Sequence, residues 1–136
     1  MENYEFLEHT ADIKFKARGR NLGELFKNSA KALIKTINSE EKIKDIKERI
    51  IKVNGRDREE LLLNFLEEFL YLVDAKNFLT SKITNLKING NQLVCKVIGD
   101  DFKNYNLSNH VKAITYSGMK IKKENGFFEV KVVLDV

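Results

Sequence analysis

The sequence has no proline and no tryptophan, and it has one cysteine and seven glycines among its 136 residues. The single cysteine, Cys95, excludes a disulfide within the chain and is typical of a reducing compartment. No apolar run approaches the roughly 20 residues that a membrane-spanning helix needs. The N-terminal residues also lack the apolar stretch of a signal peptide. We therefore expect a soluble, cytoplasmic globular protein.

Recognisable catalytic motifs are lacking as well. The glycines are dispersed, so they form neither a phosphate-binding loop nor a dinucleotide fingerprint, and a lone cysteine cannot form a CxxC motif. The net charge is +4, from 24 basic and 20 acidic residues, and the sequence pI is about 9.1. This mild excess permits contact with RNA or an acidic partner. A solvated surface of lysine and glutamate is the commoner explanation.

The apolar pattern alternates between strand and helix periods. Helices are expected after two capping pairs, Asn21 with Glu24 and Asp57 with Glu60. A hairpin is expected around the turn 89–91. Strands are expected at 13–18, 49–53, 83–88, 92–98, 112–116, 120–123 and 127–134. We predict one α+β domain over residues 1–136, with two layers, in which two helices cover one face of an antiparallel-rich mixed sheet.

Two carboxylates near the ends of the chain are the strongest candidates for a site. Asp12 directly precedes the first expected strand, and Asp135 is the penultimate residue. If these first and last strands pair antiparallel, both aspartates and the terminal carboxylate meet at one edge. Oxygen ligands of this kind suit Ca²⁺, Mg²⁺ or Mn²⁺ and would not select zinc. The alternatives are a turn aspartate at position 12 and a surface ion pair at position 135.

Two further residues could support such a site. His9 could donate a hydrogen bond to a ligating carboxylate or bind the ion itself, or it could be a partly buried structural histidine. Lys112 could balance the negative charge or contact phosphate, although an outward lysine on a strand is the commoner case. Cys95 alternates within an apolar strand, so we expect a packed thiol. His110 has no neighbours in sequence that suggest a catalytic triad.

Three segments of the sequence resemble the archease family. They are the stretch 4–13 with its His-Thr-Ala-Asp tract, the segment 111–116 with its Lys-Ala-Ile-Thr-Tyr run, and the ending 132–136 with its acidic penultimate residue. They occur in the family's order, and the resemblance covers the chain from near its first residue to its last.

The resemblance implies an accessory protein of tRNA splicing, with no catalytic residues of its own. Archeases assist the GTP-dependent RNA ligase that joins 2′,3′-cyclic-phosphate and 5′-hydroxyl ends, by promoting its guanylylation and turnover. The family's divalent ion, with calcium expected first, maps onto Asp12, Asp135 and Val136. The partners implied are the ligase and, indirectly, tRNA. Alternatives are a chaperone-like modulator of a tRNA cytosine methyltransferase and a free-standing metal-dependent hydrolase.

Overall fold

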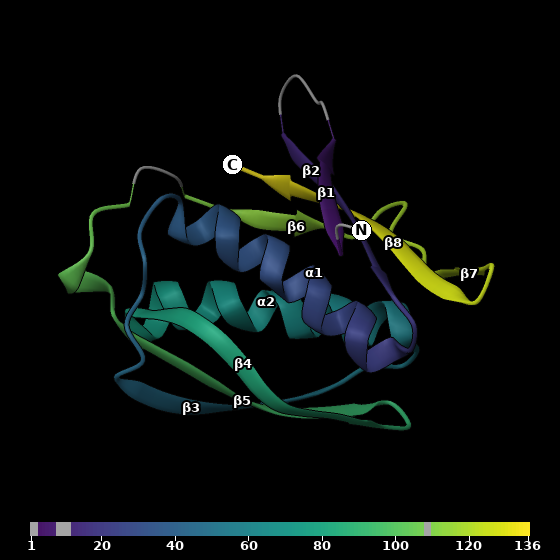
Figure 1. Cartoon of the computed structure of the whole chain (residues 1–136), viewed down its shortest axis with the longest axis horizontal. Helices are drawn as coiled ribbons and strands as arrows, with labels where there is room; N and C mark the ends of the chain where they lie inside the picture. The colour runs from purple at the N-terminus through teal and green to yellow at the C-terminus, as the bar shows by residue number, and fades with distance from the viewer. Residues whose placement is uncertain (1–2, 8–11, 108–109) are drawn as a thin grey trace.

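Eight strands, two α-helices and one short 3-10 helix are formed by the part of the chain that the computed structural model describes, residues 3–7, 12–107 and 110–136 (Figure 1). Their bounds are β1 (Tyr4–Leu7), β2 (Ile13–Gly19), α1 (Leu22–Asn38), β3 (Lys47–Asn54), α2 (Arg58–Lys76), β4 (Phe78–Asn89), β5 (Gln92–Asp101), η1 (Phe102–Asn104), β6 (Ala113–Thr115), β7 (Lys122–Glu124) and β8 (Phe127–Asp135).

Both helices begin at the capping residues that the sequence predicts. The side chain of Asn21 accepts a hydrogen bond from the backbone N–H of Glu24 at 2.8 Å, and Asp57 accepts one from Glu60 at 2.8 Å. Each bond satisfies an N–H group that has no partner within the helix. Helix α2 ends at Asn77, whose left-handed backbone (φ 52°) is a common way to stop a helix.

The strands divide between two sheets, and every described pairing is antiparallel. One sheet has the order β1-β2-β8-β6, with β7 also paired to β8, and the other has the order β3-β5-β4. The expected turn at 89–91 joins β4 to β5, with Gly90 at a positive φ of 63°. The α+β class with two helices is confirmed. We expected one sheet, and the structure has two.

The two helices lie between the two sheets and contact both of them (Figure 1). The Asn28 amide of α1 donates to the Arg18 carbonyl of β2 at 2.6 Å, and the Asn38 amide donates to the Thr80 carbonyl of β4 at 2.8 Å. Because α1 bonds to a strand of each sheet, it fixes their relative position.

One apolar core joins all three layers. The rings of Phe26 on α1 and Phe65 on α2 stack with centroids 6.1 Å apart, and Phe15 of β2 and Phe78 of β4 close the core from either sheet. Full burial of such rings is the main favourable term in folding. Within the described residues, neither helix combines the length and the apolar character needed to cross a membrane.

Candidate functional site

The first and last predicted strands lie side by side. Strands β2 and β8 pair antiparallel, and the last pair of their register is Ile13 with Leu134. Asp12 directly precedes Ile13, and Asp135 directly follows Leu134. The two aspartates therefore flank the last pair of this register, although 122 residues separate them in sequence. The predicted pairing of these two strands is confirmed.

Asp135 lies on the face of this sheet that points away from the core. Leu134 is fully buried, and side chains alternate between the two faces of a strand. Asp135 is accordingly exposed, and Asp12 is half-buried. Val136 follows with 39% of its surface exposed. We call Asp12, Asp135 and Val136 the acidic edge.

Strand β6 brings Lys112 to this edge. The backbone N–H of Lys112 donates to the carbonyl of Asp135 at 2.8 Å, and Ala113 pairs with Asp135 in the register. Lys112 and Ala113 are both exposed. The backbone of Lys112 thus lies beside that of Asp135, and the role of Lys112 in charge balance or phosphate contact stays a prediction.

Charges farther along the same face are paired. Arg18 Nε contacts Glu129 at 2.8 Å, and Lys16 lies 3.9 Å from Glu129 and 3.7 Å from Glu5. Among the described residues, by contrast, no lysine or arginine forms an ion pair with Asp135. Its carboxylate therefore keeps both oxygens available for another cation.

The donor set suits a hard divalent ion in an open site. Two carboxylates and main-chain oxygen are ligands that calcium, magnesium and manganese accept. In the described part of the chain, no group of three or more histidine, cysteine, aspartate or glutamate side chains is placed to hold a metal. Water or a partner's oxygens would have to complete the coordination.

Two other sequence candidates have different outcomes. His9 lies outside the described residues, so its supporting role stays a prediction. Cys95 is buried on the inner face of β5, and this burial raises the pKa of its thiol to about 12. A thiol that stays protonated is a poor nucleophile. The expectation of a packed cysteine agrees with this environment.

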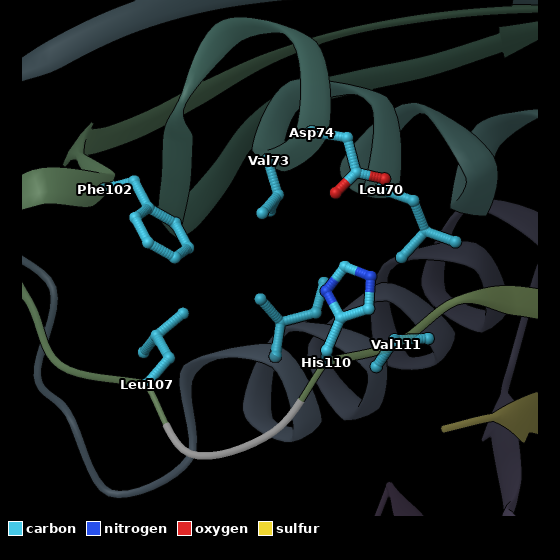
Figure 2. Close-up of a pocket in the computed structure, with 8 residues that line it drawn as sticks. Leu70, Val73, Asp74, Phe102, Leu107, His110 and Val111 are labelled. Carbon is cyan, nitrogen blue, oxygen red and sulfur yellow. The ribbon is translucent and has the colours of Figure 1, made fainter.

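A pocket between α2 and the chain before β6 was not predicted from the sequence. It has a volume of about 170 Å³, and Figure 2 shows the imidazole of His110 and the carboxylate of Asp74 pointing into the same space. Its apolar lining comes from Ile37, Leu70, Val73, Phe102, Leu107 and Val111. His110 and Asp74 form no ion pair. The two polar groups are 36 residues apart, so only the packing of α2 against the chain before β6 brings them together.

The described geometry defines a class: a two-helix α+β protein in which an early strand, β2, pairs with the last strand, β8. Residues 4–136 match the family model described as the Archease protein family (MTH1598/TM1083). The chain is 34% identical to the archease of Sulfurisphaera tokodaii over the full length of both chains. It is 34% identical to the archease of Methanosarcina mazei, covering 99% of this chain and 97% of that one.

Solved structures agree with these sequence comparisons. The solution structure of Methanobacterium thermoautotrophicum protein 1598 has a TM-score of 0.84 at 30% identity, with both chains fully covered. The crystal structure of a Thermotoga maritima archease, described as a possible chaperone, has a TM-score of 0.70 at 21% identity, covering 96% of this chain and 94% of that one. The chain belongs to the archease family, as its sequence segments indicated.

Proposed function

We propose that this protein is a cytoplasmic, metal-binding accessory protein that activates a GTP-dependent RNA-splicing ligase in tRNA maturation. Its family membership supports an accessory role. The observation that supports the proposal is the pairing of β2 with β8, whose last pair, Ile13 with Leu134, is flanked by Asp12 and by the exposed Asp135. The exposed carboxylate of Asp135 is open to a partner protein.

The residues of the acidic edge would hold the ion, with Asp12 and Asp135 as carboxylate ligands and Val136 as a main-chain oxygen ligand. Calcium is the first expectation, with magnesium or manganese as alternatives. When bound, the ion would supply positive charge for neutralising phosphate groups. The two aspartates would orient it toward the partner, and the neighbouring Lys112 would offset the negative charge that remains or contact phosphate.

The incomplete set of metal ligands at the acidic edge suits binding of the ion together with a partner protein. Two protein carboxylates form an incomplete coordination shell, so oxygens of a ligase or of its nucleotide could complete it. A closed cage of six to eight oxygens would instead hide the ion from any partner. The acidic edge is therefore better suited to presenting a cation than to a purely structural metal site.

The test is a ligation assay with limiting ligase, GTP and an RNA with 2′,3′-cyclic-phosphate and 5′-hydroxyl ends. Asp12→Ala and Asp135→Ala should each abolish stimulation and retain the native circular dichroism spectrum. Glu67→Ala, an exposed carboxylate on α2, is the matched control and should stimulate normally. Full stimulation by both edge variants would disprove the proposal.

A second candidate is a chaperone-like binder, for example of a tRNA cytosine methyltransferase. It is favoured by apolar side chains on the outer face of the three-stranded sheet, where Ile50 and Val94 are 64% and 39% exposed. The Thermotoga maritima relative is itself described as a possible chaperone. Stimulation that survives metal chelation and is lost in Ile50→Ser would favour this function over metal presentation.

A further inference from the structure

A groove lies between helix α1 and the start of strand β4, and its lining includes no residue of the acidic edge. Figure 1 shows α1 and β4. The groove has a volume of about 400 Å³. We call it the lysine groove, because four of its seven described lining residues are lysines. The lining residues are Lys27, Lys31, Ile34, Lys35, Ser81, Lys82 and Ile83.

Three of the lysines form one row along α1. Lys27, Lys31 and Lys35 are four residues apart, so they lie on the same side of the helix. With a rise of about 1.5 Å per residue, successive lysines are about 6 Å apart along the axis. Like charges at this spacing repel and destabilise a helix slightly. Such a row gains from an anionic ligand that runs alongside the helix.

Within the described residues, the charges of these three lysines are not neutralised by an ion pair. Lys47, by comparison, lies 2.8 Å from Asp101, and Lys96 lies 3.7 Å from Glu48.

The fourth lysine of the groove is partly neutralised. Lys82 lies 3.4 Å from Asp45, which also accepts a hydrogen bond from the Ser81 hydroxyl. Four lysines and this one aspartate leave three positive charges around the groove. The groove therefore favours a ligand that carries several negative charges.

The residues at the floor of the groove indicate which kind of nucleic acid it suits. Ile34 and Ile83 are 9% and 5% exposed, and none of the seven described lining residues is aromatic. Proteins that hold single strands stack bases on aromatic rings, whereas double helices are held mainly through their phosphates. A regular row of lysines at about 6 Å intervals resembles the spacing of successive phosphates along a strand.

We propose that the lysine groove binds the backbone phosphates of double-helical RNA. Lys27, Lys31 and Lys35 contact successive phosphates of one strand, and Lys82 contacts the same strand from the β4 side. Contacts of this kind position an RNA without reading its sequence. The proposal stands whether or not the acidic edge binds a metal, and it gives this chain a direct contact with RNA.

The test is fluorescence anisotropy with a labelled RNA hairpin that has a 20-base-pair stem, across a salt series. The variant is Lys27→Gln/Lys31→Gln/Lys35→Gln, and the matched control is Lys103→Gln/Lys120→Gln/Lys122→Gln, which removes the same charge from exposed lysines elsewhere. The groove variant should bind at least tenfold more weakly at 50 mM salt. A plot of the logarithm of its binding constant against the logarithm of the salt concentration should have a shallower slope. The slope should change by about 2 to 3, because each lost phosphate contact contributes about 0.9.

The loss of affinity in the control variant should be at least fivefold smaller than the loss in the groove variant. Equal losses in both triples would show an effect of net charge alone and would overturn the proposal, as would a wild-type protein that fails to bind the hairpin. Tighter binding of poly-glutamate than of RNA, lost in the groove variant, would assign the groove to an acidic protein and also overturn it. Because the glutamines remove like-charge repulsion, the groove variant should melt no lower than wild type.

Discussion

The acidic edge and the lysine groove are both clusters of like charge, but they are assembled in different ways. The acidic edge takes residues 12 and 135 from the adjoining ends of two paired strands. The lysine groove takes three of its four lysines from a single helix. The first cluster exists only if distant segments pair, whereas most of the second follows from helical periodicity. The two clusters should therefore respond differently to mutation.

The largest expected difference is in how much a buried side chain beside each region contributes to the free energy of unfolding. Phe15 is fully buried in β2 near the acidic edge, whereas Ile34 forms the floor of the lysine groove and is 9% exposed. Phe15→Ala should lower the free energy of unfolding by about 4 kcal/mol, and Ile34→Ala by about 2 kcal/mol. Urea unfolding monitored by circular dichroism measures both. A larger loss for Ile34→Ala would reverse the comparison.

Metal binding should stabilise the protein through one region only. At a calcium concentration 100 times the dissociation constant, the free energy of unfolding should rise by about 2.7 kcal/mol. The doubly substituted Asp12→Asn/Asp135→Asn protein should show no such rise, while Lys31→Gln should retain it in full. Thermal melts across a calcium series measure the effect. An undiminished rise in the double variant would place the metal elsewhere.

Acid should weaken a hydrogen-bonded carboxylate in the three-stranded sheet, which is far in sequence from the acidic edge. Asp100 accepts hydrogen bonds at 2.8 Å from the Tyr105 hydroxyl and from the Asp101 N–H, and these bonds hold the pKa of Asp100 below its ordinary value. A lowered pKa stabilises the fold above the ordinary carboxyl pKa of about 3.9, and this stability is lost as the pH falls below it.

Tyr105→Phe removes the largest cause of this shift. The pH at which half of the variant is unfolded should therefore be higher than in the wild type. The difference in free energy of unfolding between variant and wild type should be present at pH 6 and should become smaller below about pH 4. Fluorescence-monitored acid titration of the variant and of the wild type measures the shift. An unchanged midpoint would mean that the Tyr105 hydroxyl does not stabilise the charged form of Asp100.

The smallest expected effect concerns the thiol of the three-stranded sheet. Cys95 is buried, and the resulting rise of its pKa to about 12 keeps it protonated at pH 8. Labelling with a thiol reagent should be much slower in the folded protein than in urea. Asp135→Asn should label within about twofold of wild type, because Asp135 belongs to the other sheet. A faster rate would show that the acidic edge stabilises both sheets.

Local features of the fold were predictable from neighbouring residues. Asn21 and Asp57 mark the helix starts because their short side chains satisfy free N–H groups within three residues. The turn at Gly90 is recognisable because glycine readily adopts a positive φ. Strand β1, at Tyr4–Leu7, was not predicted, since four residues show little periodicity. Strand β4 was predicted to begin at residue 83, and it begins at Phe78.

Of the candidate site, the sequence alone determined the residue types and the helical spacing, because both depend on short stretches of chain. The sequence identified Asp12 and Asp135 as possible ligands. The spacing of the three lysines was not singled out from the sequence, although helical periodicity puts them on one side of α1. The tertiary structure decided that β2 pairs with β8, that the strands divide into two sheets, and that Lys82 lies beside α1. These outcomes depend on which distant strands pair and on burial of one shared core, and no local pattern encodes that choice.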